Sequence, residues 1–130
     1  MGMKIPMCLA KIHRAIVTGA KLDYVGSITI DQDLIDAAGF LPNQQVRINS
    51  VANGTSWETY IVPGERGKGE IILNGPPAHF FKAGDIVIIL AYVHVGLEDA
   101  KRMTHPQVVF VNDENHITSV EDAWRPYLGC

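Results

Sequence analysis

The segment Asp85–Val95 (DIVIILAYVHV) is a long and almost wholly apolar run. Such a run is typical of a strand buried at the centre of a sheet. Shorter segments with strand character surround it, at residues 11–18, 27–30, 45–51, 57–62, 70–73, 107–111 and 117–120. Strands that recur about every ten residues, with little helix between them, predict a mainly β chain that folds as a small β-barrel.

The boundaries of these segments carry turn and cap signals. Asn53-Gly54 and Asn74-Gly75 are hairpin-turn dipeptides, and the polar stretch 112–115 separates the last two strands into a terminal hairpin. Asp31 is expected to cap a helix that Gly39 ends. Further short helical turns are expected after Pro76-Pro77 and over Leu97–Arg102.

The strand at 45–51 alternates between apolar and polar residues. Its alternation places Val46, Ile48 and Ser50 on one face, and Arg47 and Asn49 on the other.

Length and charge exclude several classes of protein. The chain has 130 residues, which favours one domain over residues 1–120 followed by a tail over 121–130. The 11 basic and 14 acidic residues give a net charge of −3, so no basic surface is available for nucleic acid or an anionic membrane. Only 19% of the residues are charged, against about 25% in typical soluble chains, which indicates surface buried between subunits.

Other common site signals are missing from the sequence. No apolar run reaches the length of a membrane span or a signal peptide. Cys8 and Cys130 do not make a disulfide framework, which favours a cytoplasmic location. The five histidines have no ligand spacing, so no metal site is expected.

The segment Lys11–Asp31 (KIHRAIVTGAKLDYVGSITID) closely resembles the start of the bacterial aspartate 1-decarboxylase family. The similarity covers about residues 3–111 without gaps and resumes at several later motifs, which are Asn53-Gly54, Thr59-Tyr60, Glu65-Arg66-Gly67, Asn74-Gly75, Ala78-His79 and Gly84–Ile88. It implies a double-psi β-barrel with short helices, assembled as a homotetramer with active sites between subunits. It also implies an enzyme that makes β-alanine from L-aspartate, with loss of CO₂, for pantothenate biosynthesis.

The family's chemistry begins with cleavage of its own chain. By resemblance, the Ser27 hydroxyl attacks the Gly26 carbonyl, and an ester forms and undergoes β-elimination. The resulting dehydroalanine hydrolyses to a covalently bound pyruvoyl group, leaving chains 1–26 and 27–130. Gly26 suits this step because a residue without Cβ permits the close approach that the attack needs. The pyruvoyl carbonyl then forms a Schiff base with the substrate amine and accepts the electrons of the departing carboxylate.

The resemblance assigns roles to further residues. Tyr60 is expected to reprotonate the substrate, and Thr59 to assist cleavage and contact substrate. Tyr24 and Asn74 are expected to support the cleavage loop. Lys11 and His13 share one face of a strand because they are two residues apart, which suits the capture of a substrate carboxylate.

Departures from the family pattern fall in the expected substrate pocket. Ser56 stands where the family has an arginine that grips a substrate carboxylate, and a serine cannot replace a bidentate guanidinium. Pro76 and Pro77, which follow Gly75, replace two alanines in the Gly75–Pro77 segment expected to bind substrate, and proline has no N–H to offer. Asn49 occupies a variable position. Arg47, on the same strand face as Asn49, is a candidate compensating residue.

Three readings of function remain open on the sequence alone. The first is a pyruvoyl-dependent aspartate decarboxylase with a small-molecule substrate. The second is a paralogue that decarboxylates another amino acid, and the third is a non-catalytic barrel with an assembly or regulatory role. Some family members need a maturation factor for cleavage, so a protein partner for that step is also left open.

Overall fold

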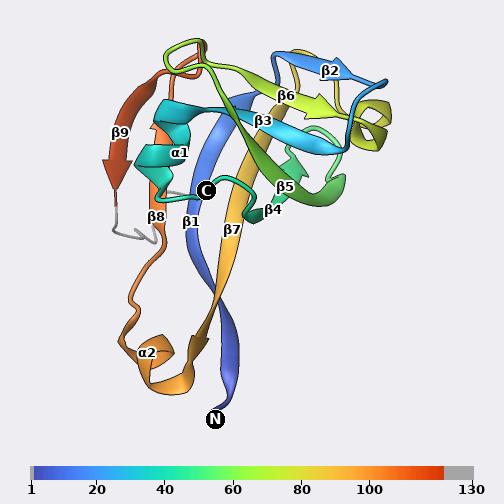
Figure 1. Cartoon of the computed structure of the whole chain (residues 1–130). Helices are drawn as coiled ribbons and strands as arrows, with labels where there is room; N and C mark the ends of the chain where they lie inside the picture. Colours follow the sequence, from blue (N-terminus) through green and yellow to red (C-terminus); the bar gives the residue numbers. More distant parts are fainter. Residues whose placement is uncertain (1, 122–130) are drawn as a thin grey trace.

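The computed structural model describes residues 2–121. It is mainly β, with one mixed sheet in the order β2-β6-β3-β5-β4-β7-β1-β8-β9. The strands are β1 (Lys4–Ile16), β2 (Gly19–Lys21), β3 (Ser27–Asp31), β4 (Gln45–Ser50), β5 (Ser56–Gly64), β6 (Ile71–Asn74), β7 (Ile86–Gly96), β8 (Gln107–Val111) and β9 (Ile117–Glu121). Figure 1 shows these strands wrapped around a common core, with the helices at the edges. The chain is a double-psi β-barrel, as the resemblance implied.

Three parallel pairings occur among the antiparallel ones. They are β2 with β6, β3 with β5, and β1 with β8. Inward side chains from successive strands fill the barrel, including Ile12, Ile28, Ile48, Ile61 and Ile89, each 0% exposed. Because side chains alternate along a strand, the neighbours of these residues in sequence face outward. Burial of Val46, Ile48 and Ser50 confirms the predicted inward face of β4.

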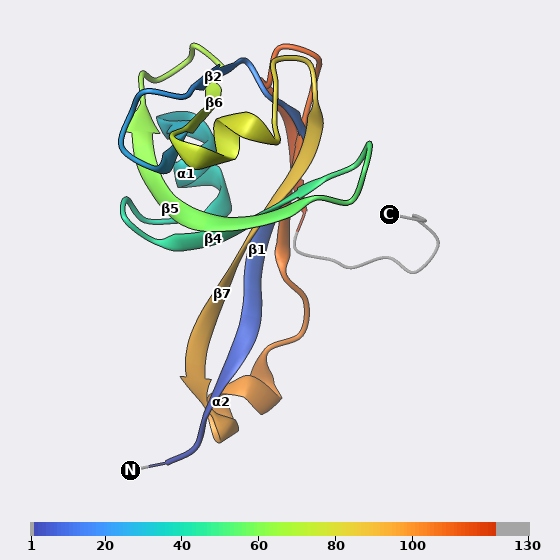
Figure 2. The ribbon, with the colours of Figure 1, turned by 90° about the vertical axis from the view of Figure 1, so that its right-hand side faces the viewer.

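One strand is longer than expected and another is less buried than expected. The β1 strand begins at Lys4, well before the expected residue 11, and pairs antiparallel with β7 from Lys4 to Ile16. Together, the first half of β1 and the second half of β7 leave the barrel as a two-stranded ribbon that ends at α2 (Figures 1 and 2). The expectation of a fully buried strand at 85–95 is therefore wrong for its second half, where Tyr92 is exposed.

The expected helices are present. Asp31 caps α1 (Gln32–Ala38) by accepting a hydrogen bond from the Asp33 N–H, and Gly39 ends the helix in the left-handed conformation. Pro76–His79 forms the 3-10 turn η1, and α2 spans Leu97–Arg102.

The end of the described chain folds back onto the barrel. The expected terminal hairpin is confirmed as β8 and β9, which continues one residue beyond 120 to Glu121. Residues 122–130, which include Cys130 and the rest of the expected tail, lie outside the described residues. Within residues 2–121, no helix combines the length and apolar character that crossing a membrane requires.

Candidate active site

The Gly26-Ser27 bond lies where an exposed loop enters the barrel. Ser27 is the first residue of β3 and pairs with Asn74, the last residue of β6. The Ser27 side chain is enclosed, with only 1% of the residue exposed. Its Oγ donates a hydrogen bond to the Val25 carbonyl, 3.2 Å away, and accepts one from Asn74 Nδ2 at 3.0 Å. The hydroxyl is thus held between the carbonyl two residues before it and the Asn74 amide.

The backbone of Gly75 packs directly against the same bond. A Cβ on Gly75 would lie 2.8 Å from Gly26 Cα and 3.0 Å from the Tyr24 carbonyl oxygen, and its φ is +79°. Only glycine meets both conditions without strain. The Gly75 N–H donates to the Lys21 carbonyl at 2.8 Å, so in this arrangement it anchors the loop and does not face a ligand.

The two prolines that follow Gly75 have different surroundings. The Pro76 ring approaches Gly26, because a Cβ added to Gly26 would be 3.6 Å from Pro76 Cδ. Pro77 is buried in η1. Tyr24 is exposed, and Lys21 Nζ lies 5.8 Å from the centre of its ring. Of these residues, Pro76 and the backbone of Gly75 approach Gly26 directly.

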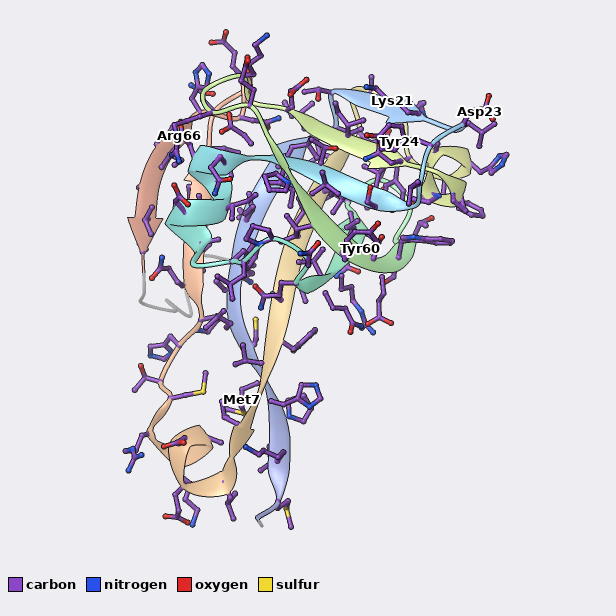
Figure 3. All side chains as sticks on the ribbon, viewed as in Figure 1. Met7, Lys21, Asp23, Tyr24, Tyr60 and Arg66 are labelled. Atoms are coloured by element: carbon purple, nitrogen blue, oxygen red, sulfur yellow. The ribbon has the colours of Figure 1, made fainter. Side chains whose placement is uncertain are left out.

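The Thr59-Tyr60 pair reaches the site through strand register. In the parallel pair β3–β5, Ile28 lies opposite Ile61, so Ser27 lies beside Tyr60. Ile28 and Ile61 both point inward, and therefore Ser27 and Tyr60 both face outward. Tyr60 is 36% exposed and leaves its phenol on the surface near the loop (Figure 3). Thr59 pairs with Val46, and among the described residues no hydrogen bond joins Thr59 to Gly26.

Lys11 and His13 lie on a distant strand of the same chain. Between β3 and β1 stand β5, β4 and β7 in the sheet order, a path of about 19 Å along the sheet at the usual strand spacing. Within residues 2–121, the hydrogen bonds of Ser27 Oγ are with Val25 and Asn74, and not with Lys11 or His13. Burial lowers the pKa of His13, and the charges of Lys11 and Arg14 lower it further. The His13 ring packs edge-on against Phe110, with the ring centres 5.5 Å apart.

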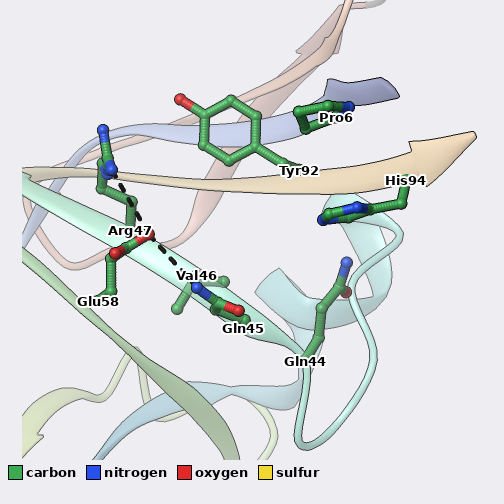
Figure 4. Close-up of a pocket in the computed structure, with 8 residues that line it drawn as sticks. All are labelled: Pro6, Gln44, Gln45, Val46, Arg47, Glu58, Tyr92 and His94. Carbon is green, nitrogen blue, oxygen red and sulfur yellow. Dashed lines mark hydrogen bonds and ion pairs between the residues drawn. The ribbon is translucent and has the colours of Figure 1, made fainter. Parts of the chain in front are cut away.

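A cavity of about 490 Å³ opens on the outward side of β4, β5 and β7. Its lining includes Arg47, Glu58, Gln45, Tyr92 and His94 (Figure 4). Arg47 Nη2 is 3.5 Å from Glu58 Oε2, and each side chain is about half exposed.

One residue of the site, Thr29, was not predicted from the sequence. Thr29 Oγ1 accepts a second hydrogen bond from Asn74 Nδ2, at 3.0 Å, so one amide joins Ser27 to Thr29. The only sequence signal is that Thr29 is two residues after Ser27 and therefore on its face. In the described part of the chain, no three His, Cys, Asp or Glu side chains gather to hold a metal ion.

Comparisons with known proteins agree with this geometry. Residues 3–118 match a protein family described as aspartate decarboxylase. An aspartate 1-decarboxylase from Caldicellulosiruptor saccharolyticus is 49% identical over 121 residues, covering 92% of this chain and 93% of that protein. One from Carboxydothermus hydrogenoformans is 48% identical over 120 residues, covering 92% and 94%. One from Clostridium beijerinckii is 50% identical over 118 residues, covering 91% and 94%. Because the match spans nearly the whole barrel, including both sides of the Gly26-Ser27 bond, this chain belongs to the aspartate decarboxylase family.

Proposed function

We propose that this chain is a pyruvoyl-dependent decarboxylase that converts L-aspartate into β-alanine and CO₂, the step that supplies β-alanine for pantothenate. The observation that carries the proposal is the enclosed Gly26-Ser27 bond in a chain about half identical to several aspartate 1-decarboxylases. A decarboxylase needs an electron sink for the electrons that the departing carboxylate leaves on the substrate.

The electron sink would be a pyruvoyl group made from Ser27. Ser27 Oγ attacks the Gly26 carbonyl carbon, the peptide bond breaks, and an ester links the two residues. Elimination across Cα–Cβ of Ser27 releases the Gly26 carboxylate and leaves dehydroalanine. Water then hydrolyses dehydroalanine, ammonia leaves, and a pyruvoyl group caps the chain that starts at residue 27. The first step needs the serine hydroxyl to be fixed near the Gly26 carbonyl, and its hydrogen bonds with the Val25 carbonyl and the Asn74 amide support this.

The surroundings of Ser27 fit such a group. The missing Cβ of Gly75 leaves the Gly26 backbone room, and the Asn74 amide offers a donor to the oxygen at position 27. When formed, a pyruvoyl carbonyl supplies the electron sink that the departing carboxylate requires.

The chain's own side chains have the remaining roles. Tyr60 Oη, beside Ser27 on the outward face, holds the proton that the substrate α-carbon receives after CO₂ leaves. Tyr24 and Asn74 keep the loop closed around the bond, and Thr59 assists its cleavage. Gly75, Pro76 and Pro77 form the wall opposite β3.

Lys11 and His13 complete the site from a second copy of the chain. In the sheet order three strands stand between β1 and β3, so these side chains are available to a neighbouring subunit's Ser27. We therefore infer a homotetramer with sites at subunit interfaces. Exposed apolar side chains around the loop, among them Val25, Tyr60 and Phe80, support association at this face.

Relatives named for aspartate favour that substrate over a different amino acid, and they favour an enzyme over a non-catalytic barrel. We also propose a cytoplasmic location.

Mass spectrometry tests the proposal. Purified protein, incubated warm, is expected to give a chain starting at residue 27 that is lighter than the serine form by the mass of ammonia. It should release CO₂ and β-alanine from aspartate. Ser27→Ala is expected to remain a single 14.3 kDa chain without activity. Cleavage of the purified chain alone would mean that no maturation factor is needed, whereas cleavage only with cell extract would indicate one. A cleaved protein inactive on aspartate contradicts the proposal.

A further inference from the structure

Aspartate has two carboxylates, and an enzyme specific for it needs a cationic side chain that binds the one not lost as CO₂. Decarboxylation removes the α-carboxylate of aspartate and retains the side-chain carboxylate. Within this chain, the charged side chains able to reach this group are those on the outward face that carries Ser27 and Tyr60. We propose that Arg47 binds the retained carboxylate and so determines the specificity for aspartate. This inference rests on the proposed function.

Strand register places Arg47 near the reacting residue. In the antiparallel pair β4–β5, Gln45 lies opposite Tyr60 and Arg47 lies opposite Glu58. Arg47 is thus a diagonal neighbour of Tyr60, and Tyr60 lies beside Ser27. Two strand spacings and two residues along the strand put the Cα atoms of Arg47 and Ser27 about 12 Å apart. An arginine side chain and an amino-acid substrate together span this separation.

The side chain also points the right way. Its neighbours Val46 and Ile48 are buried in the barrel, so Arg47 projects from the outer face that Ser27 and Tyr60 share. On that face Leu90 lies opposite Arg47, and Lys11 lies opposite Leu90, in one row across β4, β7 and β1.

The guanidinium has a donor left to offer. Within residues 2–121 its only hydrogen bond runs from Nη2 to Glu58 Oε2, so Nη1 keeps its donors for a ligand, whereas Nε is unpartnered but buried too deeply for a ligand to reach. The group's one ion pair, to Glu58, is long at 3.5 Å and half exposed, and such pairs hold their partners weakly. A planar guanidinium with free donors is the side chain best suited to a carboxylate, because it can bind both oxygens at once.

The cavity beside Arg47 gives the ligand room. Its volume of about 490 Å³ exceeds what an amino acid needs, and polar groups of Gln45, Tyr92 and His94 line it along with Arg47 and Glu58 (Figure 4). Ser27 and Tyr60 do not line the cavity, so a substrate held by Arg47 would have to extend past Gln45, which lies opposite Tyr60, to reach Ser27. The Gln45 amide donates to the same Glu58 oxygen at 3.3 Å, which draws that carboxylate away from full pairing with Arg47. Ser56, where the family pattern has its arginine, lies opposite Asn49 on the same face and has no charge.

The test compares aspartate kinetics and succinate binding for wild type and Arg47→Gln. Succinate has two carboxylates and no amine, so its protection against thermal unfolding reports binding without turnover. Loss of a charge-assisted hydrogen bond predicts a KM for aspartate that rises about 10- to 100-fold, with a smaller change in kcat. Succinate should lose its effect on the melting temperature of Arg47→Gln. The chain starting at residue 27 should carry the same pyruvoyl group as wild type and differ from it only by the mass of the Arg47→Gln substitution.

Three further variants sharpen the result. Arg47→Lys should recover part of the lost affinity, and adding Ser56→Arg to Arg47→Gln should recover more. Arg66→Gln is the matched control, because Arg66 pairs with Asp33 and Asp36 at α1, away from this face. It should leave the KM unchanged.

The outcomes separate this inference from the proposed function. If Arg47→Gln cleaves and keeps the wild-type KM and succinate response, Arg47 is only a partner of Glu58 and the inference is wrong, while aspartate decarboxylation stands. If wild type itself does not turn over aspartate, the proposed function fails and this inference fails with it.

Discussion

At the scale of single residues, one amide determines where the reactive hydroxyl lies. Asn74 Nδ2 donates to both Ser27 Oγ and Thr29 Oγ1 at 3.0 Å, so Thr29 fixes which way the Asn74 amide is turned. Thr29→Val keeps the shape and removes this partner. Self-cleavage is expected to slow about fivefold, the effect of one net hydrogen bond of about 1 kcal/mol.

A time course on denaturing gels measures the cleavage rate of Thr29→Val. Thr29→Ser is the matched control, since it keeps the hydroxyl, and it should cleave at the wild-type rate. Equal rates for the valine variant and wild type would show that Asn74 is oriented without Thr29.

His13 gives the molecule a pH dependence with a definite sign. Burial, then Lys11 and Arg14, lower the pKa of His13 from its ordinary value of about 6.5. The unfolded chain therefore binds this proton more readily than the folded one. Stability is retained above about pH 6.5 and lost as the pH falls from there through the lower folded value.

The urea midpoint of wild type, measured between about pH 7.5 and pH 5.5, should fall more steeply than that of His13→Gln. His105→Gln, at an exposed position, is the control and should behave as wild type does. If the urea midpoints of wild type and His13→Gln fall equally with pH, groups other than His13 cause the pH dependence of stability.

The residues of the proposed cleavage site were easier to find from the sequence than those of the proposed substrate site. Gly26, Ser27 and Asn74 belong to short motifs, and β3–β6 pairing joins them in the structure. The separation of Lys11 from Ser27 is a property of strand order, which no local pattern contains. The unpartnered donor of Arg47 likewise depends on the position of Glu58 across a strand pair.

At the scale of elements, the helices were predictable because their signals are local. Asp31 and Gly39 end α1 as expected. The division of β7 into a buried and an exposed half could not be predicted. A run of apolar residues looks the same in the sequence whether the strand lies inside a barrel or in a two-stranded ribbon. Ala91 is fully buried and Tyr92 is exposed, and the second half of β7 lies in the ribbon that leaves the barrel (Figure 2).

Asp31 connects two elements and makes a strong prediction. Its buried carboxylate accepts hydrogen bonds from the N–H groups of Asp33, Gly67 and Gly69, at 2.8, 3.1 and 2.6 Å. Asp31→Ala removes a helix cap and leaves two further N–H donors without an acceptor. It should therefore lower the free energy of unfolding by about 3 kcal/mol.

Urea unfolding measures this cost, in a Ser27→Ala background that keeps the chain in one piece. Asp33→Ala is the control, because it removes an exposed ion pair to Arg66 and should cost less than about 1 kcal/mol. A similar loss for both variants would contradict the role assigned to the Asp31 carboxylate.

At the scale of the whole molecule, the proposed cut divides the barrel without dividing its core. The piece 1–26 contains β1, which lies between β7 and β8, and β2, which pairs with β6. Ala10, Ile12 and Ala15 of β1 are each 0% exposed within the core. The two pieces therefore remain one folded unit after the peptide bond breaks, because strand pairing and core packing hold them together.

Expression of residues 27–130 alone tests this directly. Without β1, the facing edges of β7 and β8 lose their partner and the core loses a whole strand. The fragment is expected to show no cooperative unfolding transition, whereas co-expressed 1–26 should restore one and elute together with it in native buffer. A fragment 27–130 that unfolds cooperatively by itself would show that β1 is dispensable, and the mature protein could then lose its first 26 residues without unfolding.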